Sequence, residues 1–134
     1  MYRDDFPMLN KDIIYFDNGA TSLKPKCVID KIKDYYENYS ANAHRGDYDI
    51  SFKVDVEYEN AREEVMNFIN AKKKEEIVFT SGTTDSLNMI AFGFFQKYLE
   101  PSDEVLITTS EHASNVLPWF RLSKLIGCKV NFIP

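Results

Sequence analysis

The chain has 134 residues, of which 44% are hydrophobic and 28% are charged, a composition that suits one globular domain and excludes a disordered or fibrous chain. Its 16 basic and 21 acidic residues give a formal net charge of −5, so the basic face that nucleic-acid binding requires is not expected. No apolar run approaches the length that spans a bilayer, the start is acidic where a secretory signal is basic, and two cysteines are too few for a disulfide framework. We therefore expect a soluble, reduced, cytoplasmic protein that binds neither nucleic acid nor membrane.

The first half of the sequence predicts two amphipathic helices separated by a loop. A helix near residues 25–39 begins at Pro25, which suits a first helical turn, and its apolar residues recur at helical spacing. A second apolar stripe predicts a helix near residues 52–69. Residues 40–49 lack periodicity and are predicted to be a loop, and residues 13–16 are predicted to be a short strand or an extended segment.

The second half alternates between strand and helix. Three β-branched or aromatic runs predict parallel strands near residues 76–80, 104–108 and 129–133. Helical stripes lie between them; Pro118 suits the start of the second and Gly127 its end. This alternation predicts a three-layer α/β fold with a partial parallel sheet and right-handed crossovers. No linker, internal repeat or low-complexity segment appears in the sequence, so no domain boundary is predicted. Because a parallel sheet is normally covered on both faces, we expect the front portion of a larger α/β protein.

A turn that suits an anion lies between the first of these predicted strands and the following helix. The segment Thr80-Ser81-Gly82-Thr83-Thr84 combines a glycine, which lets an anion approach the backbone, with threonine hydroxyls that donate to phosphate oxygens. An ordinary helix-capping turn explains the same spacing equally well. Neither the P-loop pattern nor G-x-G-x-x-G is present, which weakens an ATPase or dinucleotide-binding interpretation.

A histidine, His112, follows the second of these strands. Ligands of open α/β sheets lie beyond the carboxyl ends of the strands, so His112 is expected beside the Gly82 turn. Its imidazole could stack on an aromatic ring or move a proton, although a surface-loop histidine is the commoner outcome at such a position. The only other histidine, His44, lies far away in the sequence, so no metal site is predicted. The neighbouring Arg45 could grip a carboxylate, with a solvated loop as the more common alternative.

Four motifs, in order and spacing, resemble those of one enzyme family. Residues 15–22 read YFDNGATS, residues 42–46 read NAHRG, residues 79–84 read FTSGTT and are followed by Asn88, and residues 111–119 read EHASNVLPW. Together they resemble the signatures of the cysteine desulfurases and selenocysteine lyases, the second group of that class V aminotransferase family. The likeness covers nearly the whole chain, and Gly19, where alanine is common in the family, is a small departure.

The resemblance implies a pyridoxal-phosphate-dependent transferase of the aspartate-aminotransferase fold (fold type I), with residues 1–134 as the N-terminal portion of one incomplete domain. The complete enzyme would be a cytoplasmic homodimer that removes sulfur from L-cysteine, leaving alanine and a protein-bound persulfide, in iron–sulfur cluster assembly. The resemblance also implies that Gly82, Thr83 and Thr84 bind the cofactor phosphate. His112 would stack on the pyridine ring and assist proton transfer. Four residues are implied to lie near the substrate: Asn18, Ala20, His44 and Arg45.

The covalent machinery of the family is not among these motifs. The lysine that forms a Schiff base with the cofactor, its acidic partner and the cysteine nucleophile belong to segments beyond the equivalent of Pro134. Lys97 and Lys124 belong to helical patterns, and neither Cys27 nor Cys128 matches the nucleophile. We therefore expect the chain alone to be inactive, to bind pyridoxal phosphate non-covalently at most, and to self-associate through exposed apolar surface.

Three interpretations remain open on the sequence. The chain is a fragment of a cysteine desulfurase, one half of a split enzyme that a second chain completes, or a non-enzymatic phosphate-binding module. Within the family, another class V aminotransferase or a selenocysteine lyase is also open, because the residues that discriminate between them lie in the missing part.

Overall fold

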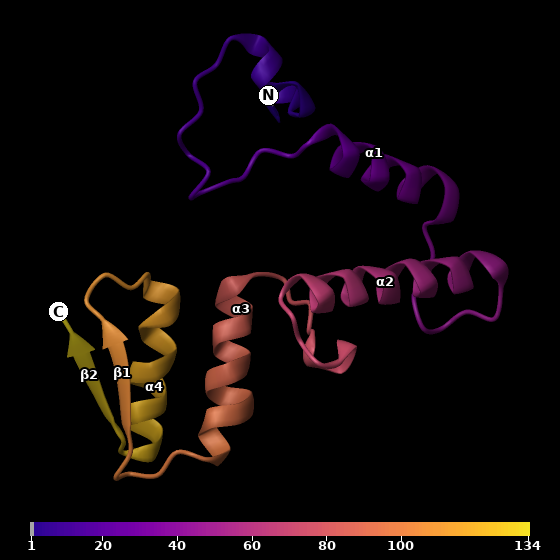
Figure 1. Ribbon diagram of the computed structural model, residues 1–134. Coiled ribbons are helices and arrows are strands. Elements are labelled where there is room, and N and C mark those ends of the chain that lie inside the picture. The colour runs from indigo at the N-terminus through magenta and orange to yellow at the C-terminus, as the bar shows by residue number, and fades with distance from the viewer. Residues whose placement is uncertain (1) are drawn as a thin grey trace. The chain divides into compact units, whose positions relative to one another are not determined.

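The computed structural model describes residues 2–134 (Figure 1). The chain forms two compact units, one ending at Ile77 and the other beginning at Val78. Within the described residues, no helix is long and apolar enough to cross a membrane.

The first unit contains two α-helices, α1 (Lys26–Asp34) and α2 (Asp49–Phe68), drawn in purple and magenta in Figure 1. α1 begins directly after Pro25, whose φ of −67° suits the entry to a helix. It continues without a break as a π-helical turn, Tyr35–Tyr39. Both helices that the apolar stripes predict are confirmed.

The loop before α2 is held by contacts with that helix. Ser51, which is fully buried, donates its hydroxyl proton to the carbonyl oxygen of Asn42 at 2.8 Å. Tyr39 is only 3% exposed. The ammonium groups of Lys31 and Lys53 form cation–π contacts with its ring, at 5.4 and 4.2 Å from the ring centroid. These contacts fix the two ends of the segment that the sequence predicts to be a loop.

Before α1, the described residues form two 3₁₀ turns, Tyr2–Asp5 and Pro7–Lys11, and no strand. Residues 13–16, predicted to be a short strand or an extended segment, are irregular. A turn follows them, in which the N–H group of Thr21 donates to the carbonyl oxygen of Asp17 at 3.0 Å.

The second unit contains a parallel pair of strands, β1 (Glu104–Thr108) and β2 (Lys129–Ile133), with Glu104 opposite Lys129. Parallel neighbours need a crossover, and α4 (Leu117–Ile126) supplies it (Figure 1). Both strands and the crossover helix are where the sequence predicts them.

The end of α4 is set by a glycine, also as predicted. Gly127 has a φ of 94°, in the left-handed region where a side chain would be strained, and its N–H group donates to the carbonyl oxygen of Ser123. The chain then turns directly into β2.

The prediction of a strand near residues 76–80, the first of the three in chain order, is wrong. Lys74–Glu76 forms a 3₁₀ turn, and residues 77–80 lie outside the sheet, although the backbone of Ile77 is extended, with φ −98° and ψ 119°. β-branched and aromatic residues favour an extended backbone, but a strand forms only where a neighbour completes its ladder. Among residues 2–134, the sheet consists of β1 and β2. The fold is therefore α/β with a smaller sheet than expected.

A helical segment precedes β1, as predicted. It begins as α3 (Thr83–Asn88) and continues as a π-helical stretch, Met89–Phe94, and a 3₁₀ turn, Phe95–Lys97. α4 contacts both the π-helical stretch and β2, so it forms the centre of the unit. The buried core of the unit combines four side chains: Ala91, Ile107, Leu122 and Cys128.

The two cysteines are both free thiols in different surroundings. Cys27 is exposed on α1, and Cys128 is 3% exposed, in the core next to β2.

Candidate functional site

The turn that begins α3 has a backbone that only glycine adopts readily. Gly82 has φ 157° and ψ 174°, a conformation in which a side chain is strained. Apart from Gly82 itself and its two chain neighbours, no described residue has an atom within 4 Å of the position that a Cβ atom would occupy there. The backbone is therefore open to a ligand on this side, as the anion-binding interpretation of the turn requires.

Local side chains hold this turn in place. The Thr80 hydroxyl donates to the carbonyl oxygen of Gly82 at 3.2 Å and lies 2.7 Å from the Ser86 hydroxyl. The Asp85 carboxylate accepts hydrogen bonds from the N–H and hydroxyl groups of Ser81 at 3.3 and 3.1 Å, which resembles a capping box. None of these bonds uses Thr83 or Thr84, and both of these residues are exposed.

Hydrogen bonds connect the turn to His112. The hydroxyl oxygens of Thr84 and Ser114 lie 2.9 Å apart, although the two residues are 30 positions apart in the sequence. The Ser114 hydroxyl in turn lies 2.9 Å from Nδ1 of His112, which is exposed. The sequence-based expectation that His112 lies beside the Gly82 turn agrees with this geometry, and the chemical role of each residue stays a prediction.

A hollow of about 330 Å³ opens beside these residues. Its lining combines apolar, hydroxyl, amide and cationic side chains: Thr84, Asn88, Phe92, Ala113, Ser114, Leu117, Pro118 and Arg121. The Asn88 amide donates to the carbonyl oxygen of Thr84 at 2.8 Å, and the guanidinium carbon of Arg121 lies 5.2 Å from the centroid of the Phe92 ring. Arg121 gives the hollow a positive charge that suits an anion.

Sequence reasoning did not single out Ser114 or Arg121. Ser114 is part of the motif around His112, but its contact with Thr84 exists only in the folded unit. Arg121 lies among the helical residues of α4, where an arginine is most often an exposed surface residue.

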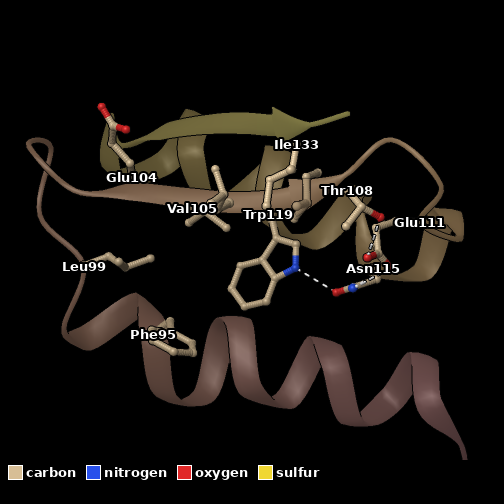
Figure 2. Close-up of a pocket in the computed structure, with 11 residues that line it drawn as sticks. Phe95, Leu99, Glu104, Val105, Thr108, Glu111, Asn115, Trp119 and Ile133 are labelled. Carbon is tan, nitrogen blue, oxygen red and sulfur yellow. Dashed lines mark hydrogen bonds between the residues drawn. The ribbon is translucent and has the colours of Figure 1, made fainter.

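A second polar cluster fixes the loop that carries His112 (Figure 2). The Glu111 carboxylate accepts hydrogen bonds from the Thr108 hydroxyl at 3.0 Å and from the Asn115 amide at 2.9 Å. The indole N–H of Trp119 donates to the Asn115 amide oxygen at 3.0 Å. In Figure 2 the Trp119 ring lies between β1 and the helical segment that carries Phe95. The cluster thus ties the end of β1 to α4 on either side of His112.

This cluster lines a larger hollow of about 420 Å³ beside β1. Hydrogen bonds from Asn115 and Thr108 lower the pKa of the Glu111 carboxyl below its ordinary value, because both stabilise the ionised form. Glu111 is thus expected to be a fixed negative charge at neutral pH.

The lowered pKa of Glu111 predicts a pH dependence of stability. A carboxyl whose pKa is lower in the folded state stabilises the protein above its unfolded pKa, and this contribution is lost as the pH falls through the folded pKa. Below pH 4.5, the ordinary value, the midpoint of urea unfolding should therefore fall more steeply in the wild-type chain than in Glu111→Gln. Fluorescence of Trp119 measures the midpoint. Glu100→Gln, an exposed site outside the cluster, should follow the wild type, and equal slopes for all three chains would refute the prediction.

The first unit carries the residues expected near a substrate. Asn18 and Ala20 lie in the turn of residues 18–20, and Asn18 lines a hollow of about 350 Å³. Both residues are exposed. The structure therefore leaves both residues accessible to a ligand.

His44 and Arg45 lie in the loop before α2. His44 has a left-handed backbone with φ 60°, and its N–H group donates to Oδ1 of Asp55 at 2.6 Å. Nδ1 of His44 lies 3.3 Å from the same oxygen, and the ring packs edge-on against Tyr58 at 5.7 Å. Arg45 is exposed. A substrate site that combines these residues with those of the second unit stays a prediction.

No group of three or more histidine, cysteine, aspartate or glutamate side chains in the described part of the chain is arranged to hold a metal ion.

Comparison with known proteins gives consistent results. A sequence family described as "Aminotransferase class-V" matches residues 14–134. The probable cysteine desulfurase of Borreliella burgdorferi is 51% identical over 134 aligned residues, which cover 96% of this chain and 32% of that protein. The chain thus spans about a third of the length of the curated relatives that it matches.

Solved structures show the same fold. An apo structure of the cysteine desulfurase from Thermococcus onnurineus NA1 superposes with a TM-score of 0.90 at 45% identity, over 98% of this chain and 32% of that one. A variant of C-DES with glycine covalently linked to its pyridoxal-phosphate cofactor superposes with a TM-score of 0.77 over 98% of this chain and 33% of that one. Its identity is 21%, so this likeness shows the fold alone.

Proposed function

The chain belongs to the class-V aminotransferase family, and on that premise we propose that it is the N-terminal part of a pyridoxal-phosphate-dependent cysteine desulfurase. The observation that carries the proposal is the series of hydrogen bonds from Thr84 through Ser114 to His112, which joins the expected phosphate turn to the expected ring-stacking histidine. Relatives named cysteine desulfurase, at 51% and 47% identity, support L-cysteine as the substrate of the complete enzyme.

The residues around the Gly82 turn fit the phosphate group of this cofactor. The backbone at Gly82 is open, the hydroxyls of Thr83 and Thr84 are exposed donors, and Arg121 adds a positive charge to the adjoining hollow. Hydrogen bonds to a charged phosphate oxygen are stronger than those between neutral groups. We therefore assign phosphate binding to Gly82, Thr83 and Thr84.

When bound, the cofactor supplies an electron sink for the bond that breaks in the amino-acid substrate. The contribution of His112 is to stack on the cofactor ring and to hold or move a proton. Among the common side chains, an imidazole is the one suited to gain or lose a proton close to neutral pH.

We assign the substrate side of the site to the first unit. Arg45 carries an exposed guanidinium group, which binds a carboxylate through two parallel hydrogen bonds when the geometry allows. We assign His44, Asn18 and Ala20 to the same side of the site, and the resemblance of their motifs to those of the family supports this assignment. In the complete enzyme both units would belong to one domain, working as a cytoplasmic homodimer in iron–sulfur cluster assembly.

Binding of pyridoxal phosphate tests the assignment of the turn. Thr84→Ala should weaken non-covalent binding by about 1–3 kcal/mol, roughly a factor of 5 to 150, because a hydrogen bond to a charged oxygen is lost. Titration of the chain with pyridoxal phosphate, followed by cofactor absorbance and by quenching of Trp119 fluorescence, measures the affinity. Thr109→Ala removes another exposed threonine, outside the turn, and should bind like the wild type. Equal affinities of all three chains would reduce the Gly82 turn to a plain helix cap.

Borohydride trapping of the chain in the presence of pyridoxal phosphate distinguishes a partial cofactor site from a self-sufficient enzyme. No lysine in the described part of the chain lines the hollow beside Thr84 and Ser114, and Lys97 and Lys124 are exposed on their helical segments. An exposed lysine with a pKa of about 10.4 is neutral in only about one molecule in a thousand at pH 7, so it is a poor nucleophile. Borohydride treatment should therefore trap no stoichiometric lysine adduct, as judged by mass spectrometry, and cysteine should release no sulfide. One fully modified lysine with sulfide release would overturn this expectation.

The relative affinities for inorganic phosphate and pyridoxal phosphate distinguish a non-enzymatic phosphate-binding module from a part of a desulfurase. A phosphate-binding module would bind inorganic phosphate as tightly as pyridoxal phosphate, because no residue would contact the cofactor ring. A part of a desulfurase should prefer pyridoxal phosphate, and His112→Ala should remove that preference.

The exposed apolar side chains, among them Phe68 at 90% and Leu106 at 61%, lead us to expect that the chain alone self-associates, which sedimentation measures.

A further inference from the structure

The backbone around His112 fixes which ring nitrogen carries the proton. His112 precedes the 3₁₀ turn Ala113–Asn115, and its Nδ1 atom accepts a hydrogen bond from the N–H group of Ser114 at 3.2 Å. A backbone N–H group can only donate, so Nδ1 must offer its lone pair. In the neutral ring the proton is therefore on Nε2.

The side chain of Ser114 favours the same tautomer of His112. Its hydroxyl oxygen is 2.9 Å from Nδ1, and since Nδ1 is an acceptor, the hydroxyl donates its proton to the ring. In the chain without cofactor, the hydroxyl oxygen then accepts the proton of the Thr84 hydroxyl, 2.9 Å away; a bound phosphate would take that proton instead. The three groups form a directed series from Thr84 through Ser114 to His112.

We propose that Ser114 is a positioning residue, which holds His112 in the Nε2–H form and fixes the plane of its ring. Two hydrogen bonds from one residue converge on Nδ1, and the Thr84 hydroxyl orients the second of them. Nε2 is consequently the atom at which His112 holds or moves a proton. The tautomer is a property of the chain itself, and only its catalytic meaning rests on the proposed function.

The other histidine provides a contrast within the same molecule. Nδ1 of His44 lies 3.3 Å from a carboxylate oxygen of Asp55, which only accepts hydrogen bonds when ionised. The neutral His44 ring should thus carry its proton on Nδ1, opposite to His112. A single spectrum of the chain should contain one histidine of each form.

Nitrogen-15 NMR of the chain without cofactor tests the proposal, because protonated and unprotonated ring nitrogens have well separated resonances. The spectrum is recorded at increasing pH until the ring-nitrogen resonances no longer change, so that it reports the neutral rings. The wild-type chain should show His112 with Nε2 protonated. In Ser114→Ala, the ratio of the Nδ1–H to the Nε2–H form should rise about fivefold, which equals about 1 kcal/mol at 1.4 kcal/mol per tenfold change.

Two further variants separate positioning from a general structural effect. Ser114→Thr keeps the hydroxyl and should restore the wild-type ratio. Ser110→Ala removes an exposed serine from the same loop and should leave the ratio unchanged. The amide spectrum of each variant reports whether the second unit stays folded. Wild-type His112 protonated on Nδ1, or the same ratio in wild type and Ser114→Ala, would overturn the proposal. Because no cofactor is present, that outcome would leave the proposed function untouched.

Discussion

Leu122→Ala is expected to destabilise the second unit by about 2–5 kcal/mol, the cost of removing a fully buried leucine side chain from a core. Leu122 has no exposed surface and lies near the middle of α4, the helix that contacts both β2 and the π-helical stretch Met89–Phe94. Its loss leaves a cavity where these elements meet. Urea unfolding followed by Trp119 fluorescence measures the effect, because the only tryptophan of the chain lies on the same helix.

A matched control is available one turn further along α4. Leu125 is 62% exposed, so Leu125→Ala removes the same atoms from the same helix with little burial. Its free energy of unfolding should stay within about 0.5 kcal/mol of the wild-type value, as for most surface substitutions. If the two variants lose the same stability, the core is not centred on Leu122.

Gly82→Ala is expected to lose about 1–3 kcal/mol of stability, because alanine would be held in a backbone conformation that only glycine adopts readily. No steric clash with the described residues adds to this cost, since none of their atoms lies within 4 Å of the new methyl group. Relief of the strain would shift the turn and should also weaken the binding of pyridoxal phosphate. Urea unfolding measures the first effect and cofactor titration the second.

Gly19 is the matched control for this substitution. A methyl group added at Gly19 would likewise meet no described atom within 4 Å, but the φ of Gly19 is not in the positive region. Gly19→Ala should therefore be neutral or stabilise the chain by about 0.4–1 kcal/mol, since alanine restricts the unfolded chain. A loss of stability in Gly19→Ala equal to that in Gly82→Ala would contradict the backbone explanation.

Most helices of the fold could be predicted from the sequence because their signals are local. The apolar stripe around Leu122 and the glycine at position 127 mark the face and the end of α4 without any knowledge of its neighbours. The strands near residues 104–108 and 129–133 were predictable for the same reason, together with the crossover that makes them parallel.

The failed strand near residues 76–80 shows the limit of local signals. Its sequence favours an extended backbone, and Ile77 has one, but strand pairing depends on a partner elsewhere in the chain. β1 and β2 pair with each other, with Val105 opposite Val130. Strand propensity at residues 77–80 could not reveal whether such a partner exists.

The candidate site was predictable only in part. Ligands of open α/β sheets lie beyond the carboxyl ends of the strands, and this rule predicted His112 beside the Gly82 turn, although the strand expected before that turn is not part of the sheet. The hydroxyl of Ser114 that joins them could not be predicted, because its partner Thr84 is 30 positions away. The tautomer of His112 depends on the backbone conformation of a single 3₁₀ turn, which no sequence pattern specifies.

Because one thiol is exposed and the other is buried, their alkylation rates together report how often the second unit opens. A water-soluble alkylating reagent reaches Cys27 on α1 in the native state, so the rate there reflects the intrinsic reactivity of the thiol. The same reagent reaches Cys128, which is 3% exposed, only when the second unit opens. The protection of Cys128 relative to Cys27 therefore reports the free energy of opening under native conditions, without any denaturant. A ligand that binds the closed second unit would slow the modification of Cys128 and leave that of Cys27 unchanged.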